Sequence, residues 1–255
     1  MTERRSDMHT TSPRISNTHF TPIATALALI LSFLTAPVHA DDSEWFVAGK
    51  VSLGEATMDS ISQQGIGTGQ LIGGRIDGAL EDTEIDDYTA GIGAAVGKRI
   101  GNWTLEGELI WRYRTDFDVA ATTDSIQTIT NVFANVETTS LMFNIYRRGV
   151  INQHWSWEVG AGIGLVTNDI DAEYLERATA TQPQMSFKDN NSETDFVYNV
   201  GAGLVRELSG PFSLNIRYRY ITLGELEAGP FPNRPGVVDA DHASHEIQFA
   251  LEFEL

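Results

Sequence analysis

The chain has 255 residues, of which 17 are Lys or Arg and 35 are Asp or Glu, so its formal net charge is −18. A nucleic-acid-binding protein needs a basic face, so this composition argues against that class. The chain contains no cysteine, so its stability does not come from disulfides.

Residues 1–40 resemble a secretory signal peptide. Three arginines precede an apolar run over residues 23–34, which is shorter than the roughly 20 residues of a transmembrane helix. Val38-His39-Ala40 is a small-x-small cleavage site, so we expect the mature protein to begin at Asp41. Removal of residues 1–40 takes away three basic and two acidic residues, which changes the net charge from −18 to −19. Residues 41–255 then have the length of a single all-β barrel domain.

The mature chain contains about eight runs in which apolar residues alternate with polar or small ones. Such a period of two is the signature of a β-strand with one apolar face. The last run is the clearest, with apolar residues at odd positions from Ile247 to Leu255. In chain order, the runs cover residues 45–53, 88–97, 103–117, 136–146, 155–165, 196–204, 212–220 and 245–255.

The two faces of these runs predict which side meets lipid. One face is aliphatic and aromatic; in the run 103–117 it includes Trp111, Tyr113 and Phe117. The other face carries charges of both signs on different strands, as in a transmembrane barrel with apolar side chains outward and polar ones inward. The inward charges are Glu106, Glu108, Arg112, Arg114, Glu158, Arg217, Arg219, Glu246, Glu252 and Glu254.

The connections between the runs alternate in length. Three short turns lie near residues 99–102, 148–154 and 208–211, and four long loops near residues 54–87, 120–131, 172–194 and 227–243. Outer-membrane barrels have short periplasmic turns and longer outer loops, so an even strand count places both termini in the periplasm. Aromatic residues at the ends of the runs predict two interfacial girdles. The periplasmic girdle comprises Trp45, Trp103 and Trp155; the outer girdle comprises Tyr88, Phe196, Tyr198, Tyr218 and Tyr220.

The pattern of the whole mature chain, above all its final strand 244–255, resembles the eight-stranded outer-membrane barrels: the opacity-protein-like surface antigens and the transmembrane domain of OmpA-type proteins. The resemblance implies a closed, up-and-down antiparallel barrel in the outer membrane of a Gram-negative bacterium. It also implies contact with outer-membrane lipid and lipopolysaccharide, and with the barrel-assembly machinery during biogenesis. The expected role is structural or in interaction, through extracellular loops that contact an outside ligand.

The inward charges have two interpretations. The lumen of an eight-stranded barrel is only wide enough for side chains to fill it, which favours a structural plug of ion pairs. The alternative is a narrow, low-conductance ion channel. Inward glycines, such as Gly201 and Gly203, leave space for the long charged side chains.

We expect no catalytic residue, cofactor or metal, and therefore no enzyme. The alternative is a lipid A-modifying hydrolase, because lipid A deacylases are similar barrels with a His-x-Ser pair; His242 and Ser244 match it. Against this, the pair has the parity of the inward face, whereas a lipid substrate lies outside. The acidic cluster Glu81–Asp87 lacks the ligand spacing of a calcium loop, and Gly65–Gly69 lacks the Lys of a phosphate-binding loop.

Overall fold

The structure is a computed structural model that describes residues 43–64, 85–123, 128–177, 183, 185–231 and 237–255. Residues 41–255 form one compact unit, whereas the predicted signal peptide lies outside the described residues. No helix in the described ranges is long and apolar enough to cross a membrane.

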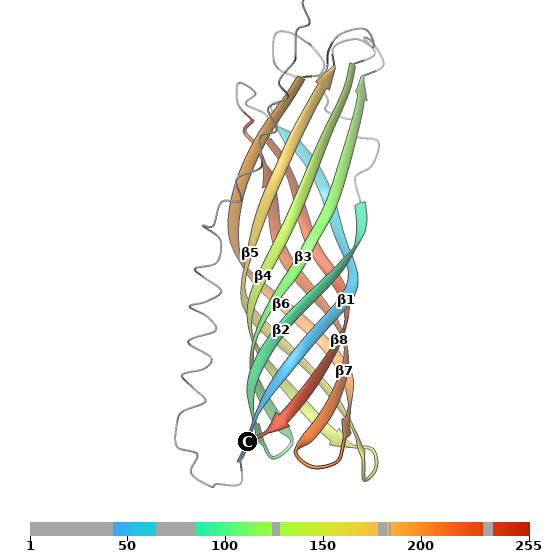
Figure 1. Ribbon diagram of the computed structural model, residues 1–255, viewed down its shortest axis with the longest axis vertical. Helices are drawn as coiled ribbons and strands as arrows, with labels where there is room; N and C mark the ends of the chain where they lie inside the picture. Colours follow the sequence, from blue (N-terminus) through green and yellow to red (C-terminus); the bar gives the residue numbers. More distant parts are fainter. Residues whose placement is uncertain (1–42, 65–84, 124–127, 178–182, 184, 232–236) are drawn as a thin grey trace, which may run out of the picture. The chain divides into compact units, whose positions relative to one another are not determined.

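Eight antiparallel strands form a closed barrel in which each strand pairs with its neighbours in sequence and β1 pairs with β8 (Figure 1). This confirms the predicted fold. The strands are β1 (Ser43–Gln64), β2 (Ile85–Ile100), β3 (Trp103–Thr123), β4 (Thr128–Val150), β5 (Trp155–Arg177), β6 (Met185–Glu207), β7 (Phe212–Ala228) and β8 (Val237–Glu254).

The strands are longer than the sequence pattern predicted, and most of the extra length is at one end. The three short turns lie at the end of the barrel that also carries the C-terminus, here called the turn end. We call the opposite end the loop end. There, β1 continues into the predicted loop 54–87 as far as Gln64, and β2 begins at Ile85. Within the predicted loop 120–131, β3 continues to Thr123 and β4 begins at Thr128. The predicted bounds of these loops were too wide because the outward face becomes polar there, which hides the alternation expected against lipid.

Around the turn end, large apolar side chains point outward and are exposed, in an apolar belt that suits lipid rather than water. Each of three tryptophans in this region has a cationic side chain from the adjacent strand over its ring. The distances from the cationic group to the ring centre are 5.2 Å for Lys98 over Trp45, 5.6 Å for Arg147 over Trp103 and 5.4 Å for Arg206 over Trp155. Further exposed members of the belt are Val51, Leu53, Ile92, Leu141, Phe143, Ile145, Val159, Ile163, Leu165, Val200, Leu204, Ile216, Ile247, Phe249 and Leu251.

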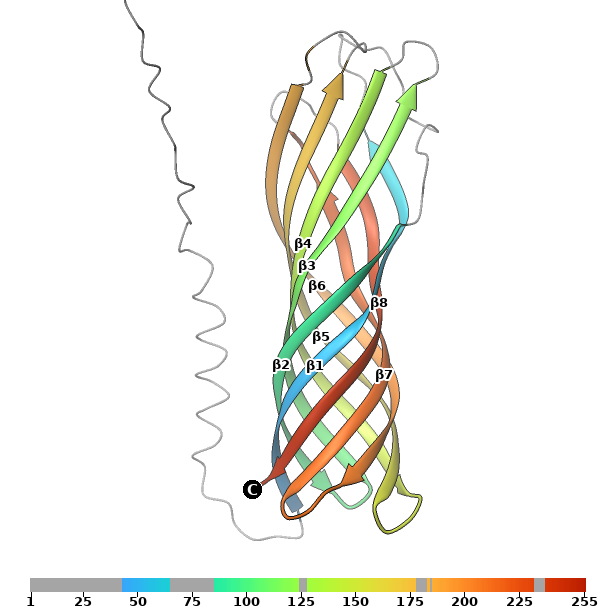
Figure 2. The same ribbon diagram turned by 45° about the vertical axis from the view of Figure 1, so that its right-hand side comes forward.

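Toward the loop end, the barrel separates into two sheets. The pairing of β2 with β3 runs from Ile100–Trp103 to Gly91–Arg112, and that of β6 with β7 from Glu207–Ser213 to Asn199–Ile221. Beyond these rows the remaining ladders join β7, β8, β1 and β2 into one sheet and β3, β4, β5 and β6 into the other. Figure 2 shows β3 to β6 side by side there, with β1, β7 and β8 behind them. We call the region beyond these rows the loop-end half and the rest the turn-end half.

Three β-bulges lie near this transition, in β1 (Asp59–Ser62), β3 (Arg112–Thr115) and β7 (Thr222–Gly224). A bulge places two residues opposite one, so each bulge exchanges the inward and outward faces of its strand. In β3, Arg112 is buried, and beyond the bulge Phe117 is buried while Asp116 is exposed. The predicted outward position of Phe117 was therefore wrong.

Candidate functional site

The lumen of the turn-end half is filled by ion pairs between strands. Lys50 of β1 donates to Glu106 at 2.6 Å and to Glu108 of β3, and Arg219 of β7 bridges Glu108 and Glu246 of β8. Arg112 of β3 also donates to Glu246. Each of these side chains is at most 2% exposed. Since an isolated buried charge is strongly unfavourable, this mutual pairing avoids the cost of leaving any of these charges unpaired.

A second group surrounds Arg217 nearer the turn end. Arg217 donates to Glu158 of β5 and, at 2.8 Å, to the hydroxyl of Tyr146 of β4. Its guanidinium lies 3.8 Å from the centre of the Tyr146 ring. Gly201 of β6 makes room for this side chain, since a Cβ there would lie 3.3 Å from the Arg217 Cδ. A Cβ on Gly203 would lie 2.6 Å from the backbone oxygen of Ile216. The glycine-rich inward face of β6 therefore accommodates the arginine, as the sequence predicted.

At the turn end, the plug ends in Arg99 and Arg148. Arg99 donates to Glu252 and Glu254, and Arg148 lies 3.6 Å from Glu158 and 3.8 Å from Glu252. The whole network joins Lys50, Arg99, Arg112, Arg148, Arg217 and Arg219 to Glu106, Glu108, Glu158, Glu246, Glu252 and Glu254. These six cations and six carboxylates balance, although the chain as a whole is strongly acidic; the exposed Glu44 is a further carboxylate, 3.8 Å from Arg99 at the edge of the network.

The structure corrects one predicted member of this network and adds three. Arg114 is exposed and lies 3.7 Å from Asp116, because the β3 bulge turns it outward. Lys50 was missed because the alternation in β1 is weak, and Arg99 and Arg148 because they were assigned to turns. A cation inside a predicted strand was the available signal for Lys50.

His242 and Ser244 both face the interior, but they do not form a nucleophile–base pair. The Ser244 hydroxyl donates to the carbonyl oxygen of Glu55 at 2.9 Å. The His242 ring packs edge-on against Phe117, with ring centroids 5.8 Å apart, and its nitrogens have no hydrogen-bond partner within the described part of the chain. Ser244 is fully buried, so a lipid substrate outside the barrel does not reach it.

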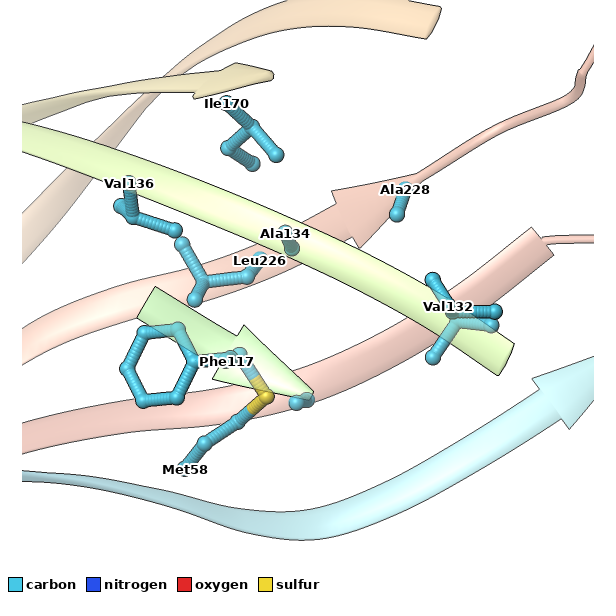
Figure 3. A pocket seen from close by; sticks show the side chains of 10 residues that line it. Met58, Phe117, Val132, Ala134, Val136, Ile170, Leu226 and Ala228 are labelled. Atoms are coloured by element: carbon cyan, nitrogen blue, oxygen red, sulfur yellow. The ribbon is translucent and has the colours of Figure 1, made fainter. Parts of the chain in front are cut away.

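Between the two sheets of the loop-end half lies an apolar core. Figure 3 shows Met58, Phe117, Val136, Ile170 and Leu226 converging from both sheets. The core leaves a cavity of only about 20 Å³, little more than one water needs. Where these described residues meet, the space between the sheets is therefore a packed core.

Along the seam between β6 and β7, side chains replace the missing backbone ladder. Asp195 accepts a hydrogen bond from the backbone N–H of Glu225 at 3.1 Å, and Asp189 accepts one from Gly229 at 3.2 Å. From β7, the Thr222 hydroxyl accepts from the N–H of Tyr198 at 3.1 Å. The two sheets are thus linked here by polar side chains in place of a continuous strand pair.

Two segments considered as ligand-binding loops in the sequence analysis lie largely outside the described residues. Residues 81–84 of the acidic cluster and all of Gly65–Gly69 lie outside the described residues, whereas Asp86 and Asp87 belong to β2. Asp87 accepts a hydrogen bond from the N–H of Asp116 across the β2–β3 seam at 3.0 Å. Within the described ranges, no group of three His, Asp or Glu residues is arranged to hold a metal ion.

Comparison with known proteins agrees with this architecture. The model of the outer membrane protein beta-barrel domain family matches residues 26–252, and the chain belongs to that family. Membership places the protein in the outer membrane of a Gram-negative bacterium. No curated protein sequence matches the chain.

Several solved structures are similar to the chain at low identity. Neisserial surface protein A has 10% identity and a TM-score of 0.42, over 84% of this chain and 100% of that one. The outer membrane protein OprG from Pseudomonas aeruginosa has 14% identity and a TM-score of 0.42, over 81% and 95%. The attachment invasion locus protein Ail of Yersinia pestis has 12% identity and a TM-score of 0.29, over 79% and 97%.

Proposed function

We propose that this protein is a non-enzymatic surface protein of the outer membrane that acts through its loop-end half, with both termini in the periplasm. The proposal rests on the reversal of polarity between the two halves. The turn-end half has an apolar outside and a charged inside, whereas the loop-end half has an apolar inside and an acidic outside. A region with an apolar core and an acidic exterior suits water, so the loop-end half stands above the membrane.

The outward positions of β5 follow this change along one strand. Ile163 and Leu165 are exposed apolar residues, whereas Asp169 and Asp171, further along the same face, are exposed carboxylates. A carboxylate in the hydrocarbon is unfavourable, so the membrane ends between these positions. The strands then continue beyond it and carry the loops away from the lipid surface.

The closed lumen supports a binding or structural role in preference to transport. The ion-pair network occupies the turn-end half with buried, mutually neutralised side chains, and the packed apolar core fills the loop-end half. An ion crossing the barrel would have to break both. The interior position of Ser244 likewise gives no support to lipid A hydrolysis.

Cysteine labelling tests the proposed topology, because the chain has no cysteine of its own. Asp171→Cys places a thiol on the exposed face of the loop-end half, and Ser209→Cys places one in the exposed β6–β7 turn. A membrane-impermeant maleimide is expected to label Asp171→Cys on intact cells and Ser209→Cys only after the outer membrane is opened. The reverse pattern would invert the topology and refute the proposal.

Two activity measurements address the alternatives. Planar-bilayer conductance of the purified barrel is expected to stay at the baseline of the lipid, and the lipid A mass spectrum of expressing cells is expected to match that of cells without the protein. Discrete conductance steps would favour the channel. An altered acyl pattern would favour the hydrolase.

A further inference from the structure

A groove lies along the β6–β7 seam, at the base of the loop-end half, and its lining includes outward-facing residues such as Asp241 together with the inward-facing Val197 and His242. Its volume is about 520 Å³, which lies within the range of roughly 300–1,000 Å³ typical of small-molecule sites. A second hollow of about 320 Å³ adjoins it and shares Asp195 and Glu225 with it. We call the first of these the seam groove.

The seam groove is lined by carboxylates that have no cation among them. Asp59 comes from β1, Asp195 from β6, Glu225 from β7 and Asp241 from β8, and no Lys or Arg belongs to the described residues that line it. In contrast, the plug of the turn-end half matches each carboxylate with a cation. The groove therefore presents negative charge that no Lys or Arg among its described lining residues neutralises.

Aromatic residues complete one side of the seam groove. Phe196, Tyr198 and Tyr220 line it, and the first two are 70% and 52% exposed. The face of an aromatic ring attracts a cation, most strongly where the cation is partly removed from water. Carboxylates combined with aromatic rings favour an organic cation over a strongly hydrated metal ion.

An independent observation is that His242, which lines the same groove, is buried without a hydrogen-bond partner among the described residues. His242 is 3% exposed, and its two ring nitrogens lack a hydrogen-bond partner in the described residues. A buried polar group normally has a partner. Near neutral pH an imidazole is mainly uncharged, so one nitrogen is free to accept a hydrogen bond from a donor in the groove.

The backbone around the seam groove is shaped by two bulges. The β1 bulge contains Ser60 with φ of 55°, and the β7 bulge contains Gly224 with φ of 87°. A Cβ on Gly224 would collide with the carboxylate of Asp195, so glycine allows Asp195 to lie over β7. Left-handed backbone at a non-glycine residue is strained, and such strain is often found at binding sites.

We propose that the seam groove binds a small organic cation carrying a primary ammonium group, with carboxylates and rings around the ammonium and His242 as an acceptor. A primary ammonium supplies three donors, which suits several carboxylates and one imidazole nitrogen together. The inference deepens the proposed function, because it assigns a ligand class to the loop-end half. The ammonium comes either from a free amine in the medium or from the headgroup of an aminophospholipid.

The test is calorimetric titration of the purified mature protein in maltoside micelles with butane-1,4-diamine, using butane-1,4-diol as the neutral probe of matched shape. The diamine is expected to bind and the diol to give no heat of binding. Asp195→Asn and Asp241→Asn each remove one charge and keep the side-chain shape. Because a charge-assisted contact contributes about 1.5–3 kcal/mol, each is expected to weaken diamine binding about tenfold or more.

His242→Phe is expected to weaken diamine binding as well, while the packing against Phe117 keeps an aromatic partner. Asp171→Asn is the control, since it removes an exposed carboxylate on β5 that does not line the groove, and it should leave the affinity unchanged. Retention of heat-modifiable gel migration shows that each variant is folded. No diamine binding, equal binding of the diol, or unchanged affinity in both aspartate variants overturns the proposal.

The source of the ammonium is distinguished by repeating the titration in nanodiscs. Phosphatidylethanolamine nanodiscs are expected to weaken diamine binding relative to phosphatidylglycerol nanodiscs if the groove takes a lipid headgroup. Equal affinities in both identify a free amine as the ligand. A failed titration leaves the surface-labelling result untouched, so the ligand and the topology are judged separately.

Discussion

The two halves of the barrel use the same eight strands with opposite polarity. In the turn-end half, Arg219 is fully buried in the lumen and Ile247 of the neighbouring strand is 49% exposed. In the loop-end half, Phe117 is buried and Asp116 of the same strand is exposed. In the proposed topology lipid surrounds the turn-end half and water surrounds the loop-end half, and the exposed residues of each half suit that solvent. The sequence of apolar and polar residues along a strand therefore depends on the solvent that each face meets, as well as on the strand structure itself.

The largest expected effect comes from removing the β3 bulge. Deleting Tyr113 leaves one residue opposite Glu137 in place of two, so Phe117 turns outward and Asp116 and Asp118 turn into the apolar core. Burying unpaired carboxylates there should destabilise the loop-end half by about 5 kcal/mol or more. Limited proteolysis in micelles is expected to cut the loop-end half while the turn-end half keeps heat-modifiable migration.

Tyr113→Phe is the control for that deletion, since it keeps the bulge and should retain the protease resistance of the parent. A deletion variant as resistant as the parent would show that the parity change does not hold the loop-end half together.

Next in size is the loss of one cation from the plug. Arg217→Leu leaves Glu158 with the neutral Asn215 and the more distant cation Arg148, at 3.6 Å, and should lower the free energy of unfolding by about 3–5 kcal/mol. Denaturant titration in lipid vesicles measures this. The adjacent Ile216→Leu, on the lipid-facing side, should change little. A silent Arg217→Leu together with a severe Ile216→Leu would reverse the assignment of inside and outside.

A charge placed on the outside distinguishes the two halves along a single strand. Ile163→Arg in β5 puts a cation into the lipid belt and should lower the free energy of unfolding by about 2–4 kcal/mol if it lies near the midplane. Asp169→Arg, six residues along the same outward face, should change it by less than about 0.5 kcal/mol. Equal losses at both positions, measured in the same vesicle titration, would place the membrane boundary beyond Asp169.

The smallest expected effect concerns the acidity of the seam. Glu193, in the second hollow and beyond the lipid belt, has its pKa raised by burial and by the neighbouring Glu227 and Asp195. A carboxyl whose pKa is higher in the folded state favours folding when protonated, and that contribution disappears as the pH rises through the folded pKa. Glu193→Gln should therefore slow proteolysis of the loop-end half slightly at pH 7 and not at pH 4. Slower cleavage only at pH 4 would contradict this linkage.

Sequence reasoning identified the interior where alternation was unbroken. Arg112, Arg217 and Arg219 were placed inward correctly, because each lies between apolar neighbours in a regular strand. Arg114 and Phe117 were placed on the wrong faces, because the bulge that reverses β3 leaves no mark in a two-residue period. The predicted outer loops were too long for a related reason, since Lys188 and Asn190 look like loop residues until a second sheet is seen to cover their strand.

The amino-acid sequence by itself determined the class of fold and the charged lumen of the turn-end half. Alternation is a local property, and a lipid-facing strand with inward charges has few other stable arrangements. Only the tertiary structure decided where the barrel divides into two sheets, which cation meets which carboxylate, and how Asp59, Asp195, Glu225 and Asp241 come to share one groove. These features depend on register between strands distant in sequence, and one extra residue in a bulge changes register without changing composition.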